Sequence, residues 1–141
     1  MRRVVITGLG VVSPIGNSSS EVLNSLKNGI SGIEFSEEMS ERGFRSQVSG
    51  NLKIDVSEKI DKRILRFMGP GAAYAHIAMT QAIEDAGLDS KDVVNYRTGL
   101  IAGSGGPSTS SILAAHQTVL EKGSTKRIGP FAVPKCMSST V

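Results

Sequence analysis

Two apolar runs along the chain each end in a glycine-rich turn. The first covers residues 4–6, followed by Thr7, Gly8 and Gly10, and the second lies within residues 98–106, TGLIAGSGG. A short apolar run bounded by turn residues is typical of a buried strand. The pattern therefore predicts two buried strands that leave the interior through turns that glycine permits.

The next pattern along the chain predicts a helix over residues 18–28. Ser18 and Glu21 have the spacing of a capping box, and Gly29 is a natural stop. Val22, Leu23 and Leu26 give this helix an apolar stripe.

Residues 30–57 are mixed and mostly polar. The stretch SEEMSERG, residues 36–43, predicts a solvated loop or a short helix. Weak alternation around residues 47–56 is typical of an edge strand or of an excursion of the chain.

Residues 58–68, EKIDKRILRFM, carry two separate helical faces. Ile60, Ile64 and Phe67 recur at helical spacing and predict one buried face. The second face is basic and consists of Lys59, Lys62, Arg63 and Arg66. Like charges at this spacing repel one another, which favours a partner that relieves the repulsion. A solvated surface is the alternative interpretation.

A longer helix is predicted from Pro70 to Ala86, because proline suits a first helical turn and Gly87 a stop. Alanines, isoleucines and methionine make it apolar on most sides, so we expect it inside the protein. His76 is then expected to line the core, and Glu84 and Asp85 to form the solvated end.

The last third of the chain contains one more amphipathic helix and one further element. Residues 110–123 predict the helix, which stops at Gly123 and whose expected buried side is formed by Ile112, Leu113, Val119 and Leu120. Prolines and small residues in 124–141 predict the further element.

The opening glycines do not match a dinucleotide-binding fingerprint. Its third glycine would fall at Ser13, and Pro14 follows, which biases Ser13 toward extended backbone and offers no amide donor. A turn that allows close packing is the better interpretation, and we expect no nucleotide there.

Composition points to an ordinary globular α/β domain. The chain has 141 residues, of which 39% are hydrophobic and 16 are glycine. Its single cysteine, Cys136, excludes an internal disulfide and suits a reducing compartment. We expect no metal cluster, no signal peptide and no membrane span, and hence a cytoplasmic protein.

The charge balance narrows the class of partner. The net charge is +3 and only 4% of the residues are aromatic, so nucleic-acid binding is poorly supported. A basic patch for one acidic protein partner fits better.

Four segments in one order carry a family resemblance: MRRVVITGLGVVSPIGN, the basic stretch ending in RFM, AIEDAGL and GLIAGSGG. Together they resemble the N-terminal part of the β-ketoacyl-acyl carrier protein synthases, the elongating condensing enzymes of fatty-acid synthesis. The resemblance covers essentially all 141 residues and is greatest to the type I branch.

The resemblance implies an α/β fold, the N-terminal half of a thiolase-like fold. In the complete enzyme that fold is a five-layer α-β-α-β-α sandwich, and the enzyme is a homodimer. Residues 1–141 are expected to be the N-terminal part of the ketoacyl synthase N-terminal domain, truncated before the catalytic cysteine. Gly8 and Gly10 are expected to permit close packing between layers.

The implied reaction is a decarboxylative Claisen condensation. A cysteine holds the acyl chain as a thioester, and two histidines help malonyl-carrier protein to lose carbon dioxide. The resemblance places that cysteine and those histidines beyond Val141, so Cys136, His76 and His116 are not expected to fill these roles. The 141 residues alone are expected to be inactive, with no cofactor and no metal.

Recognition residues follow from the resemblance position by position. The basic face that meets the acidic acyl carrier protein is matched by Lys62, Arg63 and Arg66. A second basic contact is matched by Lys126 and Arg127. Gly106 matches the gate of the acyl pocket, and Met137 a residue that lines the pocket from across the dimer interface. A simple turn glycine and an ordinary core methionine are the alternatives for the last two.

Three other functions are weighed against the elongating synthase. They are a non-catalytic partner subunit that sets chain length in a polyketide system, a type II ketoacyl synthase and a dinucleotide-binding oxidoreductase. The chain-length partner would differ by lacking the nucleophilic cysteine, and the oxidoreductase by binding NAD(P)H.

Overall fold

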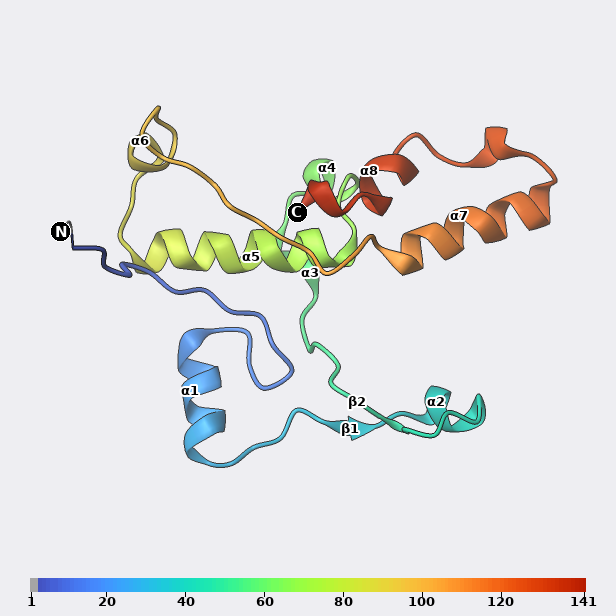
Figure 1. Ribbon diagram of the computed structural model, residues 1–141, viewed down its shortest axis with the longest axis horizontal. Helices are drawn as coiled ribbons and strands as arrows, with labels where there is room; N and C mark the ends of the chain where they lie inside the picture. The colour runs from blue at the N-terminus through green and yellow to red at the C-terminus, as the bar shows by residue number, and fades with distance from the viewer. Residues whose placement is uncertain (1–2) are drawn as a thin grey trace. The chain divides into compact units, whose positions relative to one another are not determined.

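The computed structural model describes residues 3–141 as a mixed α/β structure (Figure 1). The chain divides into two compact units. Unit 1 consists of the chain up to Ile54 together with Ala78–Leu88, and unit 2 consists of Asp55–Ile77 and Asp89–Val141. Helix α5, Pro70–Asp85, contributes its first half to unit 2 and its second half to unit 1.

In unit 1 the glycines of the first turn lie directly against the backbone of α5. A β-carbon added to Gly8 would lie 2.1 Å from the carbonyl oxygen of Ala82, and one added to Gly10 would lie 1.8 Å from that of Ala78. Real atoms do not approach so closely, so only glycine allows this contact. The prediction that these glycines permit close packing is confirmed.

Side chains of α5 bind the backbone of the same segment. The amide of Leu9 donates to a carboxylate oxygen of Asp85 at 2.9 Å, and the amide of Val11 donates to Oε1 of Gln81 at 3.0 Å. Gln81 in turn donates from Nε2 to the carbonyl oxygen of Asn17 at 2.7 Å. The segment is therefore pinned to the helix by side chains.

The two predicted buried strands are wrong for this structure. Val4 is 93% exposed and Ile101 is 98% exposed, and neither run belongs to a strand. A strand needs the N–H and C=O groups of a neighbouring strand. Among the described residues the only named strands are β1, Glu34–Phe35, and β2, Val48–Ser49, which pair antiparallel with each other.

The first helix forms where its capping residues predict it. Helix α1 spans Ser19–Lys27, the hydroxyl of Ser18 accepts from the amide of Glu21 at 3.2 Å, and Gly29 has a φ of 62°. Its apolar stripe is largely solvent-facing, because Leu23 and Leu26 are exposed and the buried side chain is Ser25. Helix α2, Glu37–Glu41, and strand β2 confirm the predicted short helix and edge strand.

The single helix predicted over residues 58–68 is wrong, because two short helices occupy this stretch. Helix α3 spans Val56–Lys59 and α4 spans Lys62–Leu65, with Ile60 in extended backbone between them. Each begins at an aspartate cap, and the carboxylate of Asp61 accepts from the amide of Arg63 at 2.7 Å. An aspartate satisfies the free amides of a new helix start, which favours the break. The predicted buried face holds at Ile60 only, since Ile64 and Phe67 are exposed.

Helix α5 has the predicted ends, with Pro70 as its first residue and Gly87, at a φ of 64°, after its last turn. In unit 2 its buried residues are Ala72, Ala73 and Ile77. The expectation that His76 lines the core is wrong, because His76 is exposed. Glu84 and Asp85 are exposed, as expected for the solvated end.

The last third of the chain forms the predicted helix and short elements after it. Helix α6, Ser90–Val93, precedes α7, Thr109–Lys122, which begins at the Ser108 cap and ends at Gly123. The buried side predicted for α7 is wrong at Ile112, Leu113 and Leu120, which are exposed. The short elements are η1, Thr125–Arg127, α8, Ala132–Cys136, and η2, Ser138–Thr140. No helix among residues 3–141 is long and apolar enough to cross a membrane.

Candidate functional site

The basic residues singled out in the sequence all lie in unit 2: Lys59 on α3, Lys62 and Arg63 on α4, Arg66 at the C-cap of α4, and Lys126 and Arg127 on η1. Lys62, Arg63 and Arg66 are all exposed. Arg63 has an acidic partner on the same helix end, because its guanidinium lies 3.2 Å from the carboxylate of Asp61. Both side chains are substantially exposed, so the pair contributes little to stability.

Asp61 is held in its charged form by hydrogen bonds from Arg63. The backbone amide of Arg63, and then its guanidinium, lower the pKa of the Asp61 carboxyl from its ordinary value. The cap is therefore fully formed above the ordinary pKa of aspartate and is lost as the pH falls through the lowered one. At neutral pH this carboxylate partly offsets the positive charge of Arg63.

Arg66 has aromatic partners. Its guanidinium carbon lies 5.0 Å from the ring centroid of Phe67 and 5.0 Å from that of Phe131. The two rings meet edge to face, with centroids 4.9 Å apart and planes at 81°. Sequence reasoning missed Phe131, because nothing in the local pattern around it indicates a contact with α4.

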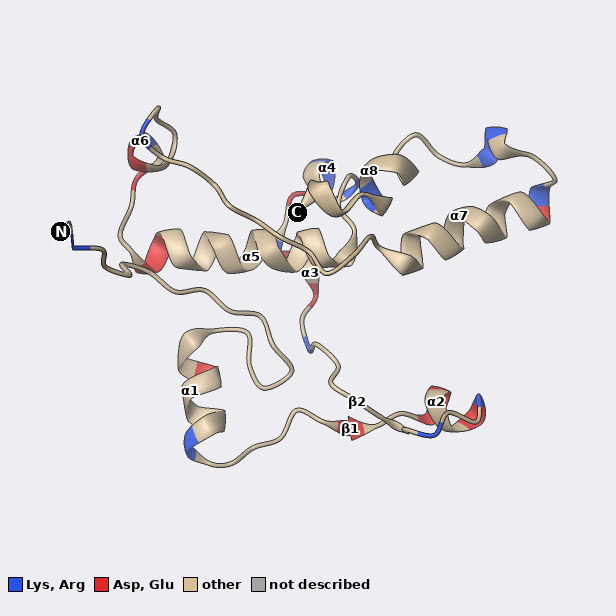
Figure 2. Cartoon of the chain, in the orientation of Figure 1, with Lys and Arg blue, Asp and Glu red and all other residues tan. Residues whose placement is uncertain are grey.

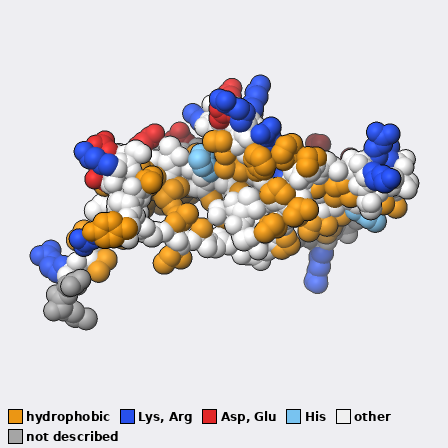
Figure 3. Space-filling model, turned by 90° about the horizontal axis from the view of Figure 1, so that it is seen from above, with side chains coloured by type: hydrophobic (Ala, Val, Ile, Leu, Met, Phe, Trp, Pro, Cys, Tyr) orange, Lys and Arg blue, Asp and Glu red, His pale blue; other side chains and the backbone are white. Residues whose placement is uncertain are grey.

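Lys126 and Arg127 lie on η1, where the hydroxyl of Ser124 accepts from the amide of Lys126 at 3.2 Å. Figure 2 shows basic residues on α4 and, separately, on the turn that follows α7. Helix α7 has 14 residues and is therefore about 21 Å long, and η1 comes after its C-terminal end. In Figure 3 the Lys and Arg side chains on the face shown form separate groups with hydrophobic side chains between them. Within unit 2 the structure thus keeps the two predicted contacts apart.

Gly106 and Met137, the two predicted substrate-binding residues, line one cavity of about 320 Å³. No atom lies within 4 Å of a β-carbon built on Gly106, and its φ is not positive. Its backbone is held locally, since the hydroxyl of Ser104 donates to the carbonyl oxygen of Gly106 at 2.8 Å. The cavity is lined by Gly69, Pro70, Gly71, Ala72, Ser104, Gly106, Pro107, Ser108, Thr109, Ser110, Lys135, Met137 and Val141.

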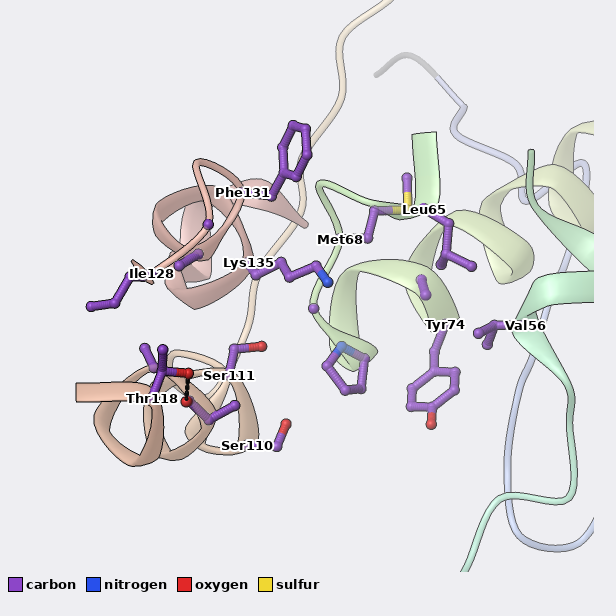
Figure 4. Close-up of a pocket in the computed structure, with 17 residues that line it drawn as sticks. Val56, Leu65, Met68, Tyr74, Ser110, Ser111, Thr118, Ile128, Phe131 and Lys135 are labelled. Carbon is purple, nitrogen blue, oxygen red and sulfur yellow. Dashed lines mark hydrogen bonds between the residues drawn. The ribbon is translucent and has the colours of Figure 1, made fainter. Parts of the chain in front are cut away.

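A second cavity of about 610 Å³ lies among α4, α5, α7 and α8 (Figure 4). Lys135 of α8 lines both cavities, and in Figure 4 its side chain extends toward the start of α5. A β-carbon on Gly69 would lie 2.7 Å from the carbonyl oxygen of Lys135, so this glycine lets α8 lie against the start of α5. The walls are Val56, Leu65, Met68, Gly69, Pro70, Ala73, Tyr74, Ser110, Ser111, Ala114, Ala115, Thr118, Ile128, Gly129, Phe131, Ala132 and Lys135.

Cys136, His76 and His116 come from three different helices, α8, α5 and α7. Cys136 is half-buried and both histidines are exposed. Within residues 3–141 no group of three or more His, Cys, Asp or Glu side chains could hold a metal ion.

Comparison with known proteins bears out the sequence resemblance. The sequence model of the family described as "Beta-ketoacyl synthase, N-terminal domain" matches residues 1–141. The chain is 51% identical over 141 residues to 3-oxoacyl-acyl-carrier-protein synthase 1 of Haemophilus influenzae, covering 100% of this chain and 35% of that protein. The chain is also 47% identical over 142 residues to the Escherichia coli K12 protein of the same name, covering 100% of this chain and 35% of that protein. Synthase 2 of Staphylococcus aureus N315 is 34% identical over 134 residues, 94% of this chain and 32% of that protein.

Solved structures share the fold. A β-ketoacyl synthase from Burkholderia phymatum superposes with a TM-score of 0.79 at 28% identity, over 99% of this chain and 35% of that one. The ishigamide ketosynthase/chain length factor superposes with a TM-score of 0.80 at 25% identity, over 94% of this chain and 33% of that one. The predicted fold class is confirmed as mixed α/β with ketosynthase neighbours, and the chain spans about 35% of the length of the curated relatives it matches first. Because the family model matches every residue of it, this chain belongs to the β-ketoacyl synthase family.

Proposed function

We propose that these 141 residues are the N-terminal part of an elongating 3-oxoacyl-acyl-carrier-protein synthase of type I, an acyltransferase of fatty-acid biosynthesis. One observation carries the proposal. Identity along the whole chain is 51% to a relative named synthase 1, against 34% to a relative named synthase 2. A chain-length factor is less favoured, because the structure whose name includes one is 25% identical.

In the proposed reaction an acyl thioester on an enzyme cysteine is attacked by the carbanion that malonyl-carrier protein becomes when it loses carbon dioxide. The thiolate of the cysteine leaves, and a 3-oxoacyl chain two carbons longer remains on the carrier protein. We assign the cysteine and the two histidines to parts of the enzyme other than these 141 residues. The contribution of this chain is recognition of the substrates.

The proposed binding site for the acyl chain is the cavity beside Gly106, which Met137 of the same chain also lines. The role that the resemblance gives Met137, from across the dimer interface, is a separate proposal. Six of the cavity's 13 lining residues are glycine, proline or alanine, which leave space that a hydrocarbon chain can occupy, and most of the others are Ser, Thr and Lys135. Burying each methylene of such a chain contributes about 0.8 kcal/mol. The open space beside Gly106 supports its assignment as the gate.

The proposed partner is the acidic acyl carrier protein, which meets α4 through Lys62, Arg63 and Arg66. Exposed cations on one short helix steer an acidic partner and fix its orientation. Lys126 and Arg127 on η1 provide a second, separate contact. As the resemblance implies, we further propose a homodimer that works in the cytoplasm.

The test is a chimera in which residues 1–141 replace the matching part of the Haemophilus influenzae relative. With acyl- and malonyl-carrier protein as substrates, the chimera is expected to form the 3-oxoacyl product at a rate within about tenfold of the parent, since half of the replaced residues are identical. A folded chimera that forms no 3-oxoacyl product while the parent does so would overturn the proposal.

A further inference from the structure

The guanidinium of Arg66 lies over rings from two places in the chain. Phe67 is the next residue, so its contact is local, whereas Phe131 comes from the start of α8. The carbonyl oxygen of Phe131 accepts from the amide of Lys135 at 3.2 Å, which ties this residue into the first turn of that helix. Phe131 is half-buried, so its ring is a firmer support than an exposed side chain.

The aromatic partners of Arg66 differ in charge from Asp61, the acidic partner of Arg63. The carboxylate of Asp61 opposes the charge of Arg63, which lies 3.2 Å away. A ring attracts a cation through its quadrupole and carries no net charge, so Arg66 keeps its full positive charge. Arg66 is therefore oriented and still available to an acidic group.

We propose that Phe131 is a positioning residue, whose ring orients the Arg66 guanidinium before the carrier protein binds. This inference rests on the proposed function of α4 as the docking surface. A free arginine loses rotamer freedom when a partner immobilises it, and an arginine already held loses less. Removing the ring is expected to weaken carrier-protein binding about two- to tenfold.

The test measures the affinity of the chimera for fluorescently labelled acyl carrier protein by anisotropy over a range of salt concentrations. Phe131→Leu keeps an apolar side chain without the π face and is expected to weaken binding by the factor above. Phe131→Tyr restores the face and should restore the affinity. Phe44→Leu in unit 1 is the matched control and should leave the affinity unchanged, because Phe44 takes part in none of the described cation–π pairs.

The dependence of the affinity on salt concentration distinguishes a loss of positioning from a loss of charge. Phe131→Leu should keep the salt slope of the parent because the charge remains, whereas Arg66→Gln should lessen the slope. In the double variant Phe131→Leu, Arg66→Gln, the loss of binding free energy should be smaller than the sum of the losses in the two single variants. Both substitutions act through one guanidinium, so their effects are not independent.

Two results would overturn the inference in distinguishable ways. If Arg66→Gln weakens binding and a folded Phe131→Leu variant does not, positioning fails and the docking surface stands. If Arg66→Gln has no effect, the docking role of Arg66 fails as well. Should Phe131→Leu not fold, Phe131→Met decides the question, because methionine is also an apolar side chain without a π face and leaves Arg66 in place. Unchanged affinity in a folded Phe131→Met variant would overturn the inference, and a two- to tenfold loss would support it.

Discussion

A β-carbon placed on Gly10 would lie 1.8 Å from the carbonyl oxygen of Ala78, on the face of α5 that the first turn covers. Gly10→Ala must therefore push the segment away from the helix. The amide of Val11, which donates to Gln81 at 3.0 Å, would move with it. We expect a loss of about 1–3 kcal/mol of stability, the usual cost of overpacking, and a lower melting temperature of the chimera.

Gly71→Ala is the matched control for this substitution. No atom lies within 4 Å of a β-carbon on Gly71, which sits in the first turn of α5. Alanine is the better helix former by up to about 1 kcal/mol, so this variant should melt at or above the parent temperature. Equal melting of the two variants would contradict the close contact at Gly10.

The pairing of Asp61 with Arg63 predicts a gain of affinity. Asp61→Asn removes the carboxylate beside the guanidinium, while asparagine remains a good helix cap. The basic surface of α4 then gains one net positive charge. We expect carrier-protein binding to tighten about two- to threefold at low ionic strength and less at high salt, as measured by anisotropy titration. Weaker binding in a folded Asp61→Asn variant would show that the aspartate itself serves the partner.

The open space beside Gly106 predicts a change of chain-length preference. Gly106→Ile should fill the cavity that Met137 also lines and shorten the acyl chains that the chimera accepts. Each excluded methylene costs about 0.8 kcal/mol, so a few of them lower acceptance of long chains tenfold or more relative to short primers. The φ of Gly106 is not positive, so isoleucine should fit the backbone without strain.

The control for the gate is Gly105→Ile, because Gly105 has equally open surroundings and does not line that cavity. It should leave the ratio of long-chain to short-chain rates unchanged. A uniform loss of activity in Gly106→Ile, with a lowered melting temperature, would mean that this glycine serves the backbone and not the pocket.

Local capping signals predicted the helices well, because they act between neighbouring residues. Ser18, Pro70 and Gly123 each stand at a helix end where the sequence pattern puts one. The strands could not be predicted in the same way, because a strand depends on hydrogen bonds from a distant segment. Residues 8–11 instead take their partners from the side chains of α5.

The arrangement of the candidate site could not be predicted from the sequence pattern. The juxtaposition of Gly106 with Met137 depends on Gly69, whose missing side chain lets α8 lie against the start of α5. The break at Ile60 removes the continuous basic face, since Lys59 belongs to α3, Lys62 and Arg63 to α4, and Arg66 follows α4 as its C-cap. The helical periodicity of the sequence continues through this break, so it could not predict that the basic face is interrupted.

The most direct test of the account compares two acyl donors in the chimera and in its triple variant Lys62→Glu, Arg63→Glu, Arg66→Glu. We predict that the variant raises KM for acyl-carrier protein at least tenfold, because charge reversal replaces attraction by repulsion on the docking surface. High salt should shrink this difference, and the kinetics with a small acyl-pantetheine donor should change much less. An equal loss with both donors, unaffected by salt, would contradict the claim that α4 recognises the carrier protein.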